Sequence, residues 1–240
     1  MLKFQLGPIP VTVSASFLFV AFIGGSFEPV FLVPWVVGVF LAILIHEAGH
    51  AFTARAFGIR QVSITLFALG GATMYPADPS LTPKRRFVVA AAGSAVAIAA
   101  GTPFLVALRT GLIDRSSPLL FNLVFAFVFA AVGWGILNWA PIRPLDGGQM
   151  MTSLLEIVIP RRAEVVSKVA SLVFGLVAAW IALRFDQRFA AVFVLIITLI
   201  GVMSPSVEAQ PAGAGPTGPA PEPDRHEPER DVGPPPAFPI

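Results

Sequence analysis

Two histidines and a glutamate within five residues of one apolar segment form the strongest chemical signal in the sequence. His46 and His50 are four residues apart, and Glu47 directly follows the first histidine. On an α-helix, side chains four residues apart share one face, so both imidazoles can bind the same metal ion. Glu47 is rotated by about 100° from His46 on such a helix, where a carboxylate can take a proton from a water molecule. Because imidazole and carboxylate donors suit zinc, the pattern predicts a zinc centre with its own general base.

A catalytic zinc site needs a third protein ligand, and Asp146 is the best candidate. It follows an apolar segment that Pro141 and Pro144 interrupt, and two glycines come directly after it. Proline ends helical pairing, and glycine allows the backbone to turn sharply. Irregular backbone at membrane depth is tolerated only where it lines a cavity. We therefore expect Asp146 to complete the metal site; the alternative is a polar turn in which Asp146 caps a helix.

The composition predicts which kind of protein carries these groups. Hydrophobic residues make up 55% of the 240 residues and charged residues only 12%, with a mean hydropathy of +0.79. A soluble domain carries about 25% charged residues, so a soluble enzyme, a secreted domain and a disordered chain are excluded. The net charge of +2 does not indicate a nucleic-acid partner, and the absence of cysteine excludes disulfides and thiolate chemistry. The chain is therefore expected to be a polytopic membrane protein.

Apolar runs long enough to cross a bilayer predict an all-α fold with about six transmembrane helices. The segment from Val62 to Met74 differs, because apolar and polar residues alternate before Gly70 and Gly71. Alternation that ends in a glycine pair is typical of a β-hairpin, which we expect to be short and membrane-associated. The six predicted spans are Val11–Phe27, Val30–Phe57, Phe87–Leu108, Leu119–Ala140, Val165–Leu183 and Phe189–Met203.

The chain is expected to divide into a transmembrane domain, residues 1–204, and a tail, residues 205–240. The tail is rich in proline and glycine and has little apolar surface to bury, so it is predicted to be disordered. Lysine and arginine divide twelve to four between the two sides of the predicted bundle. The richer side holds both termini and the loops after the second and fourth spans. Both termini are therefore expected to be cytoplasmic, with both motifs near that face.

The His46–His50 motif and the later segment with Asn138, Pro141 and Leu145-Asp146-Gly147-Gly148 together resemble the site-2 protease family of intramembrane zinc metalloproteases. The resemblance covers about residues 41–150. The arrangement of six spans and the loop with Gly70 and Gly71 are similar to those of the compact bacterial group, which includes the sporulation factor protease. It implies one zinc ion on His46, His50 and Asp146, with Glu47 as general base in peptide-bond hydrolysis. It also implies that Asn138 engages the substrate or stabilises the oxyanion. Many members carry Gly-Pro followed by Asn in the third span, whereas residues 93–97 of this chain read Gly-Ser-Ala-Val-Ala. The sequence of this span therefore gives no basis for expecting a polar contribution to the site.

The predicted hairpin resembles the family element that pairs with an unwound substrate. We expect a substrate strand to add along residues 65–69, which would supply the hydrogen bonds that an unwound backbone lacks. The implied substrate is a membrane-bound protein, such as a single-span regulator or a signal-peptide remnant, in the bilayer of a bacterial cell. The predicted substrate-binding residues are Thr65, Leu66, Phe67, Ala68, Leu69, Gly70 and Gly71.

Two other functions would use the same motif. A metal transporter would need polar residues through several spans, and the first, fifth and sixth spans have almost none. An inactive scaffold would not need every expected catalytic residue, and all of them are present. A serine protease of the rhomboid type is disfavoured, because no histidine in the later spans could activate Ser94.

Overall fold

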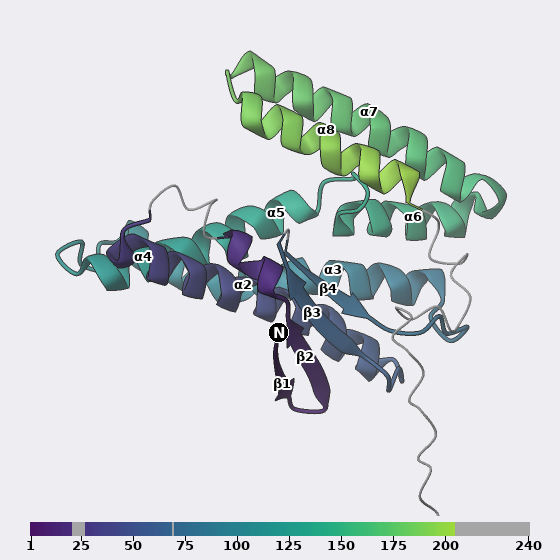
Figure 1. Ribbon diagram of the computed structural model, residues 1–240. Helices are drawn as coiled ribbons and strands as arrows, with labels where there is room; N and C mark the ends of the chain where they lie inside the picture. Colours follow the sequence, from purple (N-terminus) through teal and green to yellow (C-terminus); the bar gives the residue numbers. More distant parts are fainter. Residues whose placement is uncertain (21–26, 69, 205–240) are drawn as a thin grey trace, which may run out of the picture.

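The structure is a computed structural model that describes residues 1–20, 27–68 and 70–204. Within these residues the chain forms a helical bundle and one small sheet, as Figure 1 shows. In chain order, the elements are β1 (Leu2–Leu6), β2 (Ile9–Val13), η1 (Ala15–Phe19), α2 (Pro29–Ala56), β3 (Ser63–Phe67), β4 (Gly70–Met74), α3 (Pro83–Arg109), α4 (Pro118–Val128), η2 (Phe129–Trp134), α5 (Gly135–Asn138), α6 (Asp146–Val158), η3 (Pro160–Arg162), α7 (Ala163–Arg184) and α8 (Arg188–Met203).

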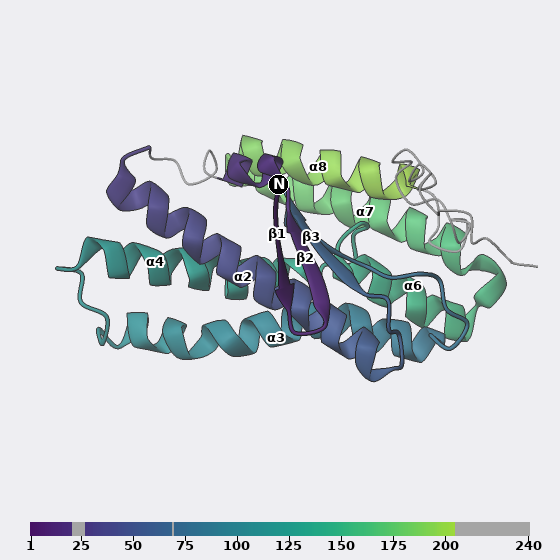
Figure 2. The ribbon, with the colours of Figure 1, turned by 60° about the horizontal axis from the view of Figure 1, so that its bottom comes forward.

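Four helical stretches in the described part of the chain are long and apolar enough to cross a membrane. They are α2, α3, the continuous stretch Pro118–Asn138 and the stretch Pro160–Arg184, and α8 is a shorter apolar helix. Figure 2 shows α2, α3 and α4 alongside one another, while α7 and α8 form a separate antiparallel pair in Figure 1. The protein is thus an integral membrane protein, and the predicted fold class of helical spans with a short β-hairpin is confirmed. Where about six spans were predicted, the described residues contain four candidate spans and one shorter apolar helix.

The first predicted span, Val11–Phe27, is wrong in the part that the structure describes. Its beginning belongs to strand β2, and Ala15–Phe19 form a 3₁₀ helix; residues 21–26 lie outside the described residues. Gly7, with φ of 59°, fits the first turn position of a tight hairpin that pairs β2 with β1. The β-branched residues of β2 are apolar enough for a membrane span but favour a strand once pairing partners are available.

The sheet has the strand order β1-β2-β3-β4. Strands β3 and β4 form the predicted hairpin, and β2 pairs with β3 in parallel. Thr65 and Leu66 are therefore paired on both sides, to β2 and to β4, so the predicted addition of a substrate strand is wrong at these two residues. Phe67 is paired to Gly70 of β4, and Leu69 lies outside the described residues. Among the described strands, β4 has the free edge on this side of the sheet.

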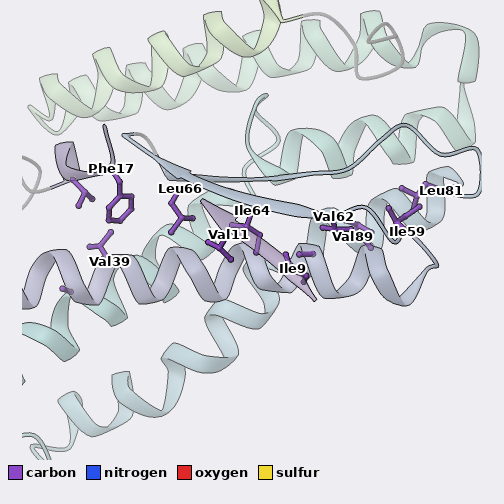
Figure 3. Close-up of a cluster of buried hydrophobic side chains, with 14 residues drawn as sticks. Ile9, Val11, Phe17, Val39, Ile59, Val62, Ile64, Leu66, Leu81 and Val89 are labelled. Carbon is purple, nitrogen blue, oxygen red and sulfur yellow. The ribbon is translucent and has the colours of Figure 1, made fainter. Parts of the chain in front are cut away.

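The main apolar core lies between the sheet and α2. Ile9, Val11, Ile64 and Leu66 are fully buried on one face of the sheet, and Figure 3 shows these side chains close to α2. Alternate residues of a strand share a face, so this burial fixes which residues of β4 face the helix. Residues paired directly across strands share a face, and the partners of Leu66 and Ile64 are Gly71 and Thr73.

Helices α2 and α3 approach closely where α2 carries the HEAGH sequence. A Cβ atom on Gly49 would lie 2.7 Å from the carbonyl oxygen of Ala92 and 2.9 Å from the Cα of Gly93. Small residues at such a crossing let two membrane helices pack backbone against backbone. The consequence is that side chains of α3 reach the functional groups of α2 directly.

Candidate metal centre

Three side chains from two distant parts of the chain meet inside the helical bundle. His46 Nε2 lies 3.1 Å from His50 Nε2 and 3.1 Å from Asp146 Oδ2. His50 Nε2 lies 3.4 Å from Asp146 Oδ1. All three residues are buried, and their donor atoms lie within 4.8 Å of one another. The structure therefore brings together the three residues that the sequence analysis singled out as ligands.

The donor set fits a tetrahedral zinc ion. Zinc bonds of about 2.0–2.1 Å at tetrahedral angles separate neighbouring donor atoms by about 3.3 Å. His46 Nε2 lies 3.1 Å from His50 Nε2 and 3.1 Å from Asp146 Oδ2, and His50 Nε2 lies 3.4 Å from the other carboxylate oxygen, Oδ1, so the Asp146 carboxylate faces both imidazoles at about this spacing. Two imidazoles and one carboxylate also leave a fourth position for water or substrate, as catalytic zinc sites do.

The orientation of the His50 ring is set by the backbone of α3. His50 Nδ1 lies 2.7 Å from the carbonyl oxygen of Val89, to which it can only donate. A proton on Nδ1 leaves the Nε2 lone pair free and directed at His46 and Asp146. A histidine that donates its other nitrogen to a carbonyl is the usual arrangement for a metal ligand.

Asp146 is placed by the turn between α5 and α6, where it is the first residue of α6. The two glycines that follow it lie against this turn. A Cβ on Gly148 would be 2.7 Å from the Arg143 nitrogen, and one on Gly147 would overlap the carbonyls of Trp139 and Ala140. The expectation that glycines let the backbone fold back at Asp146 is confirmed.

Ser94 on α3 is a polar contact that the sequence analysis missed. Its side chain has no exposed surface, and Oγ donates a hydrogen bond of 3.2 Å to Asp146 Oδ2. The neighbouring Gly93 makes room for the site, because a Cβ there would overlap the His50 ring. The third span thus contributes a polar group even though its sequence departs from the family pattern. The available signal was a serine beside a glycine that allows close helix packing.

Glu47 lies beside the three donors and is held by strand β4. It is 5% exposed, and its Oε2 accepts a hydrogen bond of 2.8 Å from Thr73 Oγ1. A Cβ on Gly71 would lie 2.7 Å from Glu47 Oε1, so the carboxylate packs directly against the strand. Thr73 was not among the residues predicted from the sequence, because no local pattern relates it to α2.

Asn138, at the end of α5, reaches the same centre. Its Nδ2 lies 3.3 Å from His46 Nε2, and the residue is buried. The segment that carries it follows six residues of π-helix, η2, a local irregularity that often occurs at functional sites. The amide is therefore within reach of a group bound next to His46.

A cavity of about 440 Å³ connects these groups. One wall is β4 and the opposite wall includes apolar side chains of α8. Of the residues predicted to bind substrate, Phe67, Gly70 and Gly71 line this cavity. Ala68 lines a smaller apolar cavity next to it. Thr65 and Leu66 line neither cavity, and the Leu66 side chain is buried in the core.

Tyr75 lines the same cavity just beyond β4, outside the candidate spans. Burial raises the pKa of its hydroxyl, against a smaller lowering by the Arg86 cation. The tyrosine thus remains a neutral hydrogen-bonding group at physiological pH, and it brings no additional charge to the metal centre.

The sequence is similar to known proteins that are named zinc metalloproteases, which agrees with the metal-binding residues found here. Residues 34–113 match the model of the family described as Peptidase family M50. The chain is 31% identical to zinc metalloprotease Rip3 of Mycobacterium tuberculosis over 114 residues, 48% of this chain and 29% of that protein. It is 26% identical to zinc metalloprotease MJ0392 of Methanocaldococcus jannaschii over 157 residues, 63% of this chain and 44% of that protein. The chain therefore spans less than half of the length of these relatives.

The fold is also similar to that of a protein of known structure. The site-2 protease from Methanocaldococcus jannaschii superimposes with a TM-score of 0.58 at 20% sequence identity. The match covers 85% of this chain and 96% of that one. This likeness shows that the two chains share a fold.

Proposed function

We propose that the protein is an intramembrane zinc endopeptidase of the site-2 protease type, because residues 34–113 match the model of Peptidase family M50 and the chain is similar to a zinc metalloprotease. The observation that carries the proposal is the cavity in which the His46, His50 and Asp146 donors meet the carboxylate of Glu47. A membrane-embedded protease acts on membrane-associated substrates, so the substrate is a protein held in or at the bilayer.

The metal ligands in this proposal are His46, His50 and Asp146. When bound, zinc would polarise the scissile carbonyl and lower the pKa of a water molecule to about 7. The three residues are buried and line the cavity, so within the described residues the cavity is the route by which an ion or a water molecule would reach them.

Glu47 is the proposed general base and general acid. It takes one proton from the attacking water, whose oxygen forms the new bond to the carbonyl carbon. When the carbon–nitrogen bond breaks, Glu47 returns this proton to the leaving amine nitrogen. Asn138 donates a hydrogen bond to the carbonyl oxygen while it carries negative charge, because its amide lies beside His46.

The substrate is proposed to bind as an extended strand. A helical segment hides its peptide carbonyls, and an unwound segment in a membrane needs new hydrogen-bond partners. The free edge of β4, Gly70–Met74, can supply them next to Glu47, in place of the β3 residues predicted from the sequence. Gly70 and Gly71 are retained from the predicted set, and Phe67 lines the cavity beside them.

We further propose that the substrate is a single-span regulator or a signal-peptide remnant, and that the protein resides in a bacterial cell membrane with its C-terminus in the cytoplasm. Counting only described residues from α2 onward, nine lysines and arginines lie on the side where α2 ends and four on the other. The excess supports a cytoplasmic location for the end of α2. The nine are Arg55, Arg60, Lys84, Arg85, Arg86, Arg143, Arg161, Arg162 and Lys168; the four are Arg109, Arg115, Arg184 and Arg188.

The test is cleavage in a defined membrane. The purified protein and its Glu47→Gln variant are placed in liposomes with single-span proteins that accumulate in cells carrying the variant. We expect the unsubstituted protein to cleave at least one of them within or next to its span, and the variant to be inactive. Glu28→Gln, a matched change at the start of α2 and outside the cavity, is expected to leave cleavage unchanged. Cleavage by Glu47→Gln at the unsubstituted rate, or zinc flux without cleavage, would contradict the proposal.

A further inference from the structure

We propose that Thr73 is a positioning residue that ties the general base Glu47 to the edge strand β4. The inference rests on the proposed function, because it assigns to Thr73 a part in the reaction in which Glu47 is the base. Thr73 lies on the strand that borders the substrate cavity and carries the free edge of the sheet.

The first observation is a pair of contacts made by one hydroxyl. Thr73 Oγ1 lies 2.8 Å from Glu47 Oε2 and 3.0 Å from the Glu47 carbonyl oxygen. Both distances are within hydrogen-bonding range, and because the hydroxyl has one proton, it donates to the carboxylate or shares this proton with the carbonyl oxygen of the same residue of α2. A buried carboxylate without a partner is costly, so this hydroxyl strongly favours one orientation of the Glu47 side chain.

The second observation is the packing of Gly71, two residues earlier on the same strand. Gly71 and Thr73 face α2, since their partners Leu66 and Ile64 are buried against that helix. A Cβ on Gly71 would lie 2.7 Å from Glu47 Oε1 and 2.8 Å from its Cδ. Strand β4 therefore holds the carboxylate at two points: Gly71 leaves the space for it, and Thr73 donates to one of its oxygens.

The hydroxyl can serve both forms of Glu47 that the proposed reaction passes through. It has one proton and two lone pairs. It donates to Oε2 while Glu47 is a carboxylate. When Glu47 takes a proton from water on its other oxygen, Oε1, which lies beside Gly71 in the cavity lining, Thr73 keeps its bond to Oε2. The proton then stays available to the leaving amine, and no heavy atom has to move between the two forms.

The position of Thr73 on an edge strand gives this contact a further consequence. A substrate strand that pairs with β4 immobilises the strand, and Thr73 transmits this order to the base. Loss of the hydroxyl should therefore slow the chemical step while substrate pairing through the backbone of β4 remains. In kinetic terms, kcat should fall and KM should stay the same.

The test compares Thr73→Val, Thr73→Ser and a matched control, Thr12→Val, in the liposome assay. Thr12 lies on β2 of the same sheet and does not line the cavity. A misplaced catalytic group costs on the order of 100-fold in rate, so we expect Thr73→Val to lower kcat by about 10- to 100-fold. Its KM, zinc content and melting temperature should match those of the unsubstituted protein. Thr73→Ser should restore kcat, and Thr12→Val should not change it.

Four results would overturn the role of Thr73. The first two are an unchanged kcat in Thr73→Val and a change in its KM alone. The third is a loss of zinc or of folding in Thr73→Val that Thr73→Ser does not restore. The fourth is a kcat of Thr73→Ser that is as low as that of Thr73→Val. If Thr73→Val fails to fold, Gly71→Ala with Thr73 intact gives an independent measure: kcat should fall while zinc is retained, and an unchanged kcat contradicts the inference. Failure of the proposed function is distinct, because the unsubstituted protein and Glu47→Gln would then behave alike.

Discussion

Ser94 Oγ donates a hydrogen bond to Asp146 Oδ2 across the interface between α3 and α6. The same carboxylate oxygen lies 3.1 Å from His46 Nε2 on α2. Two helices thus hold one side chain that belongs to a third. The carboxylate is oriented before any ion binds, which should favour metal binding because less freedom is lost.

Replacing Ser94 by alanine should weaken zinc binding without unfolding the protein. The hydrogen bond orients Asp146, and loss of such a partner typically costs about 10- to 100-fold in metal affinity. Competition with a chelator of known affinity measures the effect. Thr102→Ala is the matched control, because its hydroxyl is on the same helix but bonds to the carbonyl of Ile98. Equal zinc affinity in Ser94→Ala and Thr102→Ala would show that Ser94 does not orient the ligand.

Gly93→Ala should disrupt the metal site sterically. The added Cβ would overlap the His50 ring, and the backbone contact between α2 and α3 leaves no space for relief. We expect substoichiometric zinc and a lower melting temperature, with overpacking costing about 1–3 kcal/mol. Gly133→Ala is the control, since a Cβ there meets nothing within 4 Å. A variant with full zinc content and an unchanged melting temperature would contradict this account of Gly93.

Removal of the metal should lower stability in a way that depends on the three donors. Zinc that binds only the folded protein stabilises it by about 2.7 kcal/mol at a free concentration 100 times its Kd. A chelator should therefore lower the melting temperature, and added zinc should restore it. In Asp146→Ala the melting temperature should not respond to zinc. A response of the same size in that variant would place the ion elsewhere.

Gly201→Ala on α8 should disturb the metal site indirectly, through the turn that positions Asp146. A Cβ there would overlap the backbone of Arg143 and Pro144, which belong to the turn that leads to Asp146. We expect a lower melting temperature together with reduced zinc content. Leu199→Ala, on the same helix but 57% exposed, should keep the zinc content of the unsubstituted protein. Normal zinc content in both variants would mean that α8 does not support this turn.

The orientation in the membrane can be tested cleanly because the sequence has no cysteine. Ser80 and Ser116 are exposed in loops at opposite ends of α3. In intact cells, a membrane-impermeant maleimide should label Ser116→Cys and leave Ser80→Cys unlabelled until the cells are opened. The reverse labelling would contradict the proposed orientation.

The parts of the fold that depend on local signals could be predicted from the sequence. Long apolar runs predicted α2, α3, the stretch Pro118–Asn138, α7 and α8, and alternation before a glycine pair predicted the β3–β4 hairpin, whereas α6 lay in none of the predicted spans. The first span could not be assigned correctly, because its residues are equally suited to a strand. Its fate depends on the parallel pairing of β2 with β3, which joins segments far apart in the chain. Hydropathy contains no information about such pairing.

Some residues of the candidate site could likewise be predicted from the sequence, and others could not. His46, Glu47 and His50 share a helical face, and the glycines after Asp146 mark a sharp turn, so these groups were accessible to sequence reasoning. Thr73 and Ser94 were not, since a single hydroxyl becomes significant only through what it contacts in three dimensions. The free edge at β4 was also missed, because the strand order of a sheet is a property of the whole chain.

The central claim is that two imidazoles of α2 and the carboxylate of Asp146 bind one zinc ion. Zinc K-edge absorption on the purified protein tests it most directly, together with the zinc content per chain. The account predicts one zinc per chain, with two imidazole nitrogens at about 2.0–2.1 Å and carboxylate oxygen at about 2.0–2.2 Å, and loss of this signal in Asp146→Ala. Full zinc content and an unchanged spectrum in Asp146→Ala would contradict it.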